Sequence, residues 1–205
     1  NSEIIITVGA SEGVDASFRA IIAPGDEVLI PEPCFVCYEP LVRLCGGVPV
    51  PIDCKIENEF KLTAEQLESS ITPKTKCLLL SYPNNPTGAI MEKEDLEKLV
   101  PIIKKHDLLV LSDEIYGELV YDDAKFTSIA SLDGMRERTI LVSGFSKYFA
   151  MTGWRLGYVC APKEIIDVIY KIHQFAIMCA PTSAQYVALE ALNASFKDGF
   201  EEVEC

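Results

Sequence analysis

The sequence predicts an α/β fold in which a mostly parallel sheet is covered by helices on both faces. Short apolar runs alternate with longer amphipathic patterns along the 205-residue chain. Most of these runs are apolar throughout, which is typical of strands buried on both faces. Hydrophobic residues make up 49% of the chain, which is enough for one sizeable domain with a well-buried core.

The expected strands are short and either β-branched or apolar throughout. In chain order they cover residues 4–8, 28–30, 48–52, 76–82, 108–111, 139–142 and 156–161. Pro31 and Pro33 are expected to close the second strand, because proline cannot donate to a sheet ladder.

The expected helices carry apolar residues three or four positions apart. In chain order they cover residues 14–22, 38–45, a short stretch after Thr63, 96–103, 165–177 and 182–192. Thr63 and Gln66 have the form of a capping box, and Thr182 is expected to cap the last helix. Pro101 implies a kink or an early stop in its helix. Residues 201–204 form an acidic tail with no evident structure.

Composition excludes several classes of partner. The net charge is −13 and no basic stripe exists, which disfavours nucleic acid. No apolar run approaches the roughly 20 residues that span a bilayer, so no membrane partner is expected. The first residues do not resemble a signal peptide, and a cytoplasmic protein is the simplest expectation.

The eight cysteines do not form a metal-binding framework. Cys34 and Cys37 make one C-x-x-C pair, but Cys45 and Cys54 provide no second pair at zinc-site spacing. With only two histidines in the chain, no metal site is expected. Most of the cysteines are better interpreted as small buried apolar residues in a reducing compartment.

Chemically useful residues follow the carboxyl ends of the expected strands. These residues are Gly9, Ala10, Ser11, Phe35, Asn85, Asp113 and Lys147. In an open α/β sheet this edge is where ligands bind. The sequence therefore predicts a ligand site built from distant parts of the chain.

Lys147 differs from the other lysines, which stand mostly in polar runs. Its neighbours include Phe145, Phe149 and Met151, and burying an ammonium among them is costly unless it is used. Apolar surroundings favour the neutral amine that Schiff-base chemistry needs. The alternative is a lysine that extends from a strand end to solvent.

An anion site is expected where residues 9–11 begin a helix, because the first backbone N–H groups of a helix are free. Arg155 is the candidate cation, since a guanidinium binds phosphate oxygens in pairs. The alternative for Arg155 is an ordinary surface ion pair.

Four further residues fit a flat, nitrogen-containing ring. Asp113 ends a buried strand and could keep a ring nitrogen protonated, or else cap the residues that follow. Tyr116 could donate to a phenolate oxygen, and Asn85 lies between two prolines in a rigid loop that could aim its amide. Phe35 could stack on the ring, which contributes about 0.5–1.5 kcal/mol beyond burial. Each could also be a turn or core residue.

A serine hydrolase uses some of the same residues, because residues 9–13 match G-x-S-x-G between a strand and a helix. That mechanism requires a histidine. His106 is expected at the amino end of a strand, which is the wrong edge, and His173 lies inside a helix. The hydrolase hypothesis also leaves Lys147 without a role.

Five segments together resemble the class I/II aminotransferases, which are fold-type I pyridoxal-phosphate enzymes. The segments are TVGASEG, PEPCFVCY, SYPNNPTG, SDEIY and SGFSKYFAMTGWRLGY. The resemblance runs from about residue 3 to beyond residue 181. It implies a three-layer domain with a seven-stranded, mostly parallel sheet whose single antiparallel strand covers residues 156–161.

The resemblance also implies roles for the residues above. Lys147 would carry the cofactor pyridoxal 5′-phosphate as a Schiff base and, with Asp113 and Tyr116, perform catalysis. Asp113 would pair with the ring nitrogen, and Asn85 and Tyr116 would bind the 3′ oxygen. Phe35 would stack on the ring, while the turn at residues 9–11 and Arg155 would hold the phosphate. Many relatives have a phosphate-binding serine where this chain has Gly144, so Ser143 or Ser146 is expected to substitute.

Family members are nearly twice as long as this chain. Residues 1–205 therefore resemble the cofactor-binding large domain, without the N-terminal segment and the C-terminal small domain, which carries the arginine for the substrate carboxylate. The resemblance implies an aminotransferase that acts on an amino acid and a 2-oxo acid and forms a homodimer. Alternatives are a sensor domain of a transcriptional regulator, or a β-lyase or decarboxylase on the same fold. The substrate stays open.

Overall fold

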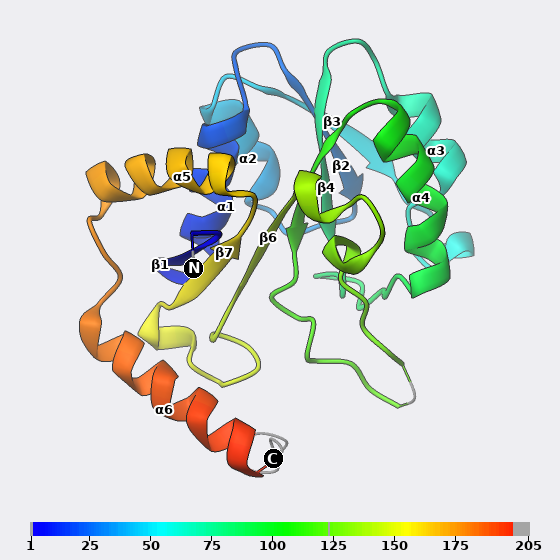
Figure 1. Cartoon of the computed structure of the whole chain (residues 1–205). Coiled ribbons are helices and arrows are strands. Elements are labelled where there is room, and N and C mark those ends of the chain that lie inside the picture. Colours follow the sequence, from blue (N-terminus) through cyan, green and yellow to red (C-terminus); the bar gives the residue numbers. More distant parts are fainter. Residues whose placement is uncertain (1, 123, 199–205) are drawn as a thin grey trace.

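A seven-stranded mixed sheet forms the centre of the protein, as the sequence predicts (Figure 1). The computed structural model describes residues 2–122 and 124–198. The strands lie in the order β1-β7-β6-β5-β4-β2-β3 across the sheet. They are β1 (Ile4–Thr7), β2 (Glu27–Glu32), β3 (Val48–Asp53), β4 (Thr75–Ser81), β5 (Leu109–Asp113), β6 (Thr139–Gly144) and β7 (Gly157–Cys160).

Strand β7 runs antiparallel to both of its neighbours, β1 and β6, whereas the other pairs are parallel. The single antiparallel strand is therefore confirmed. The direction of β7 matters for the site. Six strands end at one edge of the sheet, and β7 begins at that same edge. A residue just before β7, such as Arg155, thus joins residues that follow the other strands.

Six α-helices connect and cover the strands in the described part of the chain. They are α1 (Gly9–Ile21), α2 (Tyr38–Leu44), α3 (Ala64–Ser70), α4 (Lys93–Lys105), α5 (Lys163–Ala176) and α6 (Thr182–Asp198). Short 3₁₀ turns cover Ile56–Asn58, Ile129–Ser131, Arg136–Arg138 and Thr152–Trp154. Figure 1 shows α1, α2 and α5 on one side of the sheet and α3 and α4 on the other.

Alternating side chains of the strands bury both faces of the sheet. Leu79 packs in one core with Phe18 of α1 and Ile169 of α5. Leu78 points to the opposite core, where it meets Leu99 of α4. Because successive side chains of a strand point to opposite faces, an all-apolar strand serves both cores. This arrangement gives the three layers that the resemblance implies.

Helix α6 packs on the segment that contains Lys147. A third, smaller core joins Phe145, Met151 and Leu156 to three alanines of the α6 region, Ala180, Ala184 and Ala188. Small side chains let a helix approach closely, so α6 braces the loop on both sides of the lysine.

Two expected stops at proline are wrong. Strand β2 continues through Pro31 to Glu32, and α4 continues through Pro101 to Lys105. Helix α6 begins at Thr182, the first residue of its expected range. The capping box of α3 is confirmed, since Thr63 and Gln66 each bond the other's backbone N–H. Residues 201–204 lie outside the described residues. Among the described helices, none has the length and apolar character to cross a bilayer.

Candidate active site

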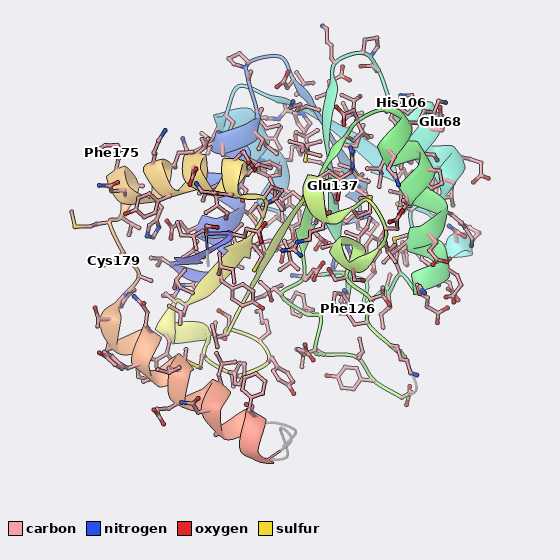
Figure 2. The ribbon with its side chains drawn as sticks, viewed as in Figure 1. Glu68, His106, Phe126, Glu137, Phe175 and Cys179 are labelled. Carbon is pink, nitrogen blue, oxygen red and sulfur yellow. The ribbon has the colours of Figure 1, made fainter. Side chains whose placement is uncertain are left out.

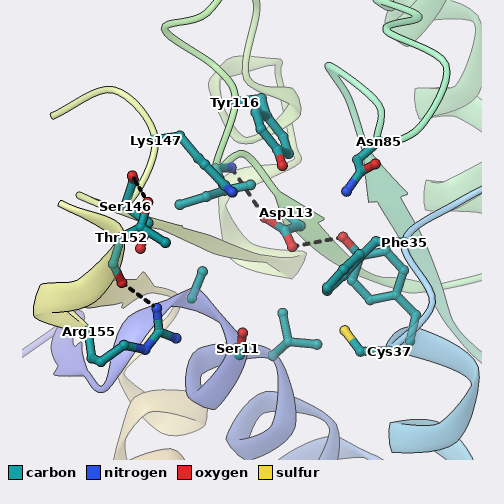
Figure 3. Close-up of a pocket in the computed structure, with 14 residues that line it drawn as sticks. Ser11, Phe35, Cys37, Asn85, Asp113, Tyr116, Ser146, Lys147, Thr152 and Arg155 are labelled. Atoms are coloured by element: carbon teal, nitrogen blue, oxygen red, sulfur yellow. Dashed lines mark hydrogen bonds between the residues drawn. The ribbon is translucent and has the colours of Figure 1, made fainter. Parts of the chain in front are cut away.

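A cleft at the carboxyl edge of the sheet collects side chains from six separate stretches of the chain. Figure 3 shows this cleft. It is lined by Ala10, Ser11, Val14, Phe35, Cys37, Tyr38, Asn85, Asp113, Ile115, Tyr116, Ser146, Lys147, Thr152 and Arg155. Nine of the predicted site residues are among them, and Gly9 and Ser143 are not.

One end of the cleft carries two positive features. Arg155 adopts a left-handed backbone (φ +53°) and donates from Nη1 to the carbonyl of Thr152 at 2.9 Å. Its guanidinium lies against the first residue of α1, because a Cβ on Gly9 would stand 2.6 Å from Arg155 Nη2. A helix start repels a cation. An anion placed between them would be stabilised by both, and Ser11 adds a hydroxyl there (Figure 3).

The centre of the cleft is a buried carboxylate. Asp113 is 6% exposed, accepts a hydrogen bond from Tyr38 Oη at 2.8 Å and another from the Ile115 N–H at 3.2 Å. Burial raises the pKa of Asp113, and these two hydrogen bonds oppose the shift. The bond to Ile115 is the turn that the alternative interpretation expected. The carboxylate nevertheless borders the cleft, where a bound cation would stabilise its ionised form.

Lys147 extends into the cleft from the loop after β6 (Figure 3). Its Nζ lies 5.4 Å from the centre of the Tyr116 ring. The expectation that apolar neighbours bury this lysine is wrong, because its side chain is exposed. Phe145 and Met151 instead pack away from it, against α6. The amine is therefore accessible to a ligand from the open side of the cleft.

The far end of the cleft presents an amide and a phenol. In the loop after β4, the Asn84 side chain bonds to Ser81 and Thr87 and so holds the loop together. Asn85 is left to point into the cleft, where Tyr116 also lies (Figure 3). Phe35 lines the opposite wall, half-exposed, with its ring edge-to-face on Tyr38.

The structure separates the two candidate serines. Ser146 lines the cleft. Ser143 lines a second cavity and donates to the carbonyl of Glu114 at 3.2 Å. Steric crowding explains why position 144 is a glycine and not a serine. A Cβ there would stand 2.8 Å from Gly157 Cα on β7. In this chain a serine at 144 would therefore force β6 and β7 apart.

Sequence reasoning missed Cys37, Tyr38 and Thr152 in the cleft. Tyr38 was interpreted only as the start of a helix, yet its hydroxyl contacts both Asp113 and Ser81, at 2.8 and 2.9 Å. The only signal was that a buried carboxylate requires a donor, and no local pattern identifies Tyr38 as that donor. Thr152 positions the lysine loop by donating to the Ser146 carbonyl at 2.9 Å.

The hydrolase arrangement is not formed. His106 Nε2 pairs with Glu68 Oε1 at 3.0 Å on the α3–α4 side of the molecule (Figure 2), and neither histidine is among the residues that line the cleft. Within residues 2–122 and 124–198, no group of three or more His, Cys, Asp or Glu side chains is placed to bind a metal ion.

Comparison with known proteins agrees with this geometry. YugH of Bacillus subtilis (strain 168) is 54% identical over 204 residues, which cover 100% of this chain and 52% of that protein. The aspartate aminotransferase of Pyrococcus abyssi is 50% identical over 192 residues, covering 94% of this chain and 49% of its own length. The crystal structure of an aromatic aminotransferase from Pyrococcus horikoshii OT3 superposes with a TM-score of 0.93 at 46% identity, covering 98% of this chain and 55% of that one.

The chain thus spans about half the length of the relatives it matches. The family model for aminotransferase class I and II matches residues 1–204. A model that matches this much of the sequence, together with the shared fold, leaves one conclusion: the chain belongs to the class I and II aminotransferase family.

Proposed function

We propose that the protein is the cofactor-binding large domain of a pyridoxal-phosphate-dependent aminotransferase, which moves an amino group from an amino acid to a 2-oxo acid. The observation that carries this proposal is the cleft itself. An accessible lysine amine, a buried carboxylate and an arginine against a helix start all border it. The aminotransferases among its relatives support the same activity.

The residues present fit pyridoxal phosphate. A phosphate matches the end of the cleft where Arg155 and the start of α1 are both positive. A protonated ring nitrogen matches the buried Asp113 carboxylate, which otherwise lacks a positive partner among the groups that contact it. Phe35 offers the ring an aromatic face, and Asn85 and Tyr116 offer donors to its hydroxyl oxygen.

Bound pyridoxal phosphate supplies an electron sink for negative charge that develops on the substrate α-carbon. The protein groups perform the remaining tasks. Lys147 Nζ would hold the cofactor aldehyde and would take a proton from the substrate α-carbon as general base. Asp113 would keep a proton on the ring nitrogen. Tyr38 orients Asp113 through its 2.8 Å hydrogen bond, and Tyr116 would help to orient the ring.

Several features of the complete enzyme follow as proposals. The length of the relatives supports a longer parent with further segments, including the group that binds the substrate carboxylate. Aspartate and aromatic amino acids are candidate donors, because relatives are named for them. We also propose a homodimer. All seven cysteines in the described residues are unpaired, which supports a reducing compartment such as the cytoplasm.

Replacement of Lys147 by alanine tests the proposal. The unaltered protein is expected to bind pyridoxal phosphate with a new near-visible absorbance band and to become labelled at Lys147 after borohydride reduction. Lys147→Ala is expected to lose both signals, because Lys147 is the only lysine that lines the cleft in the described part of the chain.

Lys171→Ala is the matched control, since it removes an exposed lysine from α5, outside the cleft. It is expected to behave as the unaltered protein. Borohydride labelling that persists undiminished in Lys147→Ala would reject Lys147 as the site of attachment.

A further inference from the structure

A buried glutamate–histidine pair lies behind the proposed phosphate end of the cleft. Glu12, in the first turns of α1, accepts a hydrogen bond from the Val8 N–H at 2.5 Å through Oε2. Its other oxygen, Oε1, lies 2.6 Å from His173 Nδ1. The side chains are 16% and 5% exposed. An ionised carboxylate only accepts hydrogen bonds, so His173 Nδ1 is assigned as the N–H that donates a hydrogen bond to Glu12 Oε1.

The pair connects the start of α1 with α5, which lies much later in the sequence. His173 lies on α5, 161 residues after Glu12, and α5 packs directly on α1. Figure 1 shows these two helices side by side. Val8 is the residue that precedes the helix, and its own side chain makes no cap. Glu12 therefore supplies the hydrogen bond that holds the chain where it enters α1.

The position of that hydrogen bond is informative. A capping side chain binds N–H groups of the first helical turn or, in the other half of a capping box, reaches back to the N–H of the residue before the helix. Glu12 makes the second kind of bond, at Val8. The N–H groups of Gly9, Ala10 and Ser11, which have no acceptor inside a helix, thus stay available to an anion in the cleft.

Electrostatics provides a second argument for a role of His173. The positive end of a helix stabilises a glutamate in its first turns, but here the same turns would also bind a phosphate. Unopposed, the two anions would repel each other. The imidazole donates to Glu12 and directs its carboxylate into the α1–α5 interface.

We propose that His173 is a positioning residue for the cofactor phosphate. Acting through Glu12, it holds the first turn of α1 so that residues 9–11 present their N–H groups to the cleft. The inference rests on the proposed function, because it assumes that a phosphate binds there. His173 itself does not touch the cleft.

The test compares pyridoxal phosphate with pyridoxal, which has the same ring and aldehyde but no phosphate. Both are titrated by near-visible absorbance into the unaltered protein and its variants. His173→Gln fills a similar volume but places its amide nitrogen near the Nε2 position, away from Glu12. It is expected to weaken pyridoxal phosphate about tenfold and to change pyridoxal by less than about twofold. His173→Asn, whose amide nitrogen matches Nδ1, is expected to recover most of the lost affinity.

His106→Gln is the matched control, because His106 also pairs with a glutamate, Glu68, on the α3–α4 side of the molecule (Figure 2), and neither residue lines the cleft. It is expected to leave both affinities unchanged. Glu12→Leu, which removes the acceptor for both Val8 and His173, is expected to match the loss in His173→Gln.

The positioning role is overturned if His173→Gln weakens both ligands equally, since the pair then supports the fold alone. It is likewise overturned if neither ligand is affected. If the unaltered protein binds neither ligand, the proposed function fails and this inference fails with it. If the unaltered protein binds pyridoxal phosphate but the variants show no selective loss of affinity for it, the positioning role of His173 is rejected and the proposed function stands.

Discussion

Two adjacent carboxylates at the end of β5 serve different sides of the sheet. Asp113 points into the cleft, whereas Glu114 accepts hydrogen bonds from Ser112 and Ser128 at 2.8 and 2.7 Å. Successive residues of a strand face opposite ways, so the two acids have separate surroundings. Burial raises the pKa of Glu114 to about 7, more than its two serine donors lower it.

This shift predicts a pH-dependent stability. Because the folded pKa of Glu114 lies above its ordinary value, the folded state holds this proton more tightly, and the contribution is lost as pH rises from about 4.5 through about 7. Glu114→Gln keeps an acceptor for both serines but cannot ionise. The variant is expected to gain stability over the unaltered protein by up to about 3 kcal/mol between pH 5 and pH 8.

Urea unfolding at several pH values measures the difference. Glu118→Gln, at an exposed neighbouring position, is the control and is expected to show no such trend. A constant difference between Glu114→Gln and the unaltered protein across this pH range would contradict the prediction.

At the scale of residues, sequence reasoning located the site but not all of its surroundings. Residues after strand ends were predictable, because strand direction alone brings them to one edge. The exposure of the Lys147 side chain was not predictable. It depends on where the Phe145 ring packs, and that ring packs against α6. Tyr38 was missed because its partner Asp113 is 75 residues away.

At the scale of elements, both misplaced ends involve proline. Beyond Leu29, β4 no longer pairs with β2, so Pro31 needs no N–H on that side and the strand continues along β3. Pro101 is exposed, and water can satisfy the helix carbonyl that its missing N–H leaves free. Proline stops an element only where its N–H is needed, and neighbours decide that.

Close backbone approach also positions an element of the site. A Cβ on Gly157 would stand 2.5 Å from both the Ala10 nitrogen and the Gly9 carbonyl carbon. Real side chains do not approach that closely, so α1 can begin where it does only because β7 begins with glycine.

Gly157→Ala is therefore expected to displace the start of α1, to weaken pyridoxal phosphate at least about tenfold and to lower the melting temperature. Gly153→Ala is the control, because a Cβ there meets no atom within 4 Å. Cofactor titration and thermal unfolding of both variants decide the matter. Unchanged binding in Gly157→Ala would show that the first turn of α1 can shift without loss.

At the scale of the molecule, the reversal of β7 makes the site possible. With six strands ending at one edge and β7 beginning there, the anion end, the carboxylate and the lysine meet without any long loop. The general order of strands and helices was predictable from periodicity. The neighbour relations of the sheet were not, because no local pattern records which strand pairs with which.

The surface beyond the cleft bears on the proposed homodimer. Phe175 and Met178 lie where α5 ends and the chain turns toward α6, and they are 86% and 75% exposed. Figure 2 shows Phe175 and Cys179 at this connection. Two large apolar side chains this exposed and this close in sequence are typical of a contact surface.

The double variant Phe175→Lys with Met178→Lys is therefore expected to raise the dimer dissociation constant at least about tenfold, because two ammonium groups would have to be desolvated at the contact. Leu44→Lys is the matched control, since Leu44 is 69% exposed on α2, at the opposite edge of the sheet. Sedimentation velocity over a wide range of protein concentrations measures the dissociation. If the double variant and the control dissociate alike, the connection between α5 and α6 is not part of the dimer contact, and another exposed apolar surface must hold it.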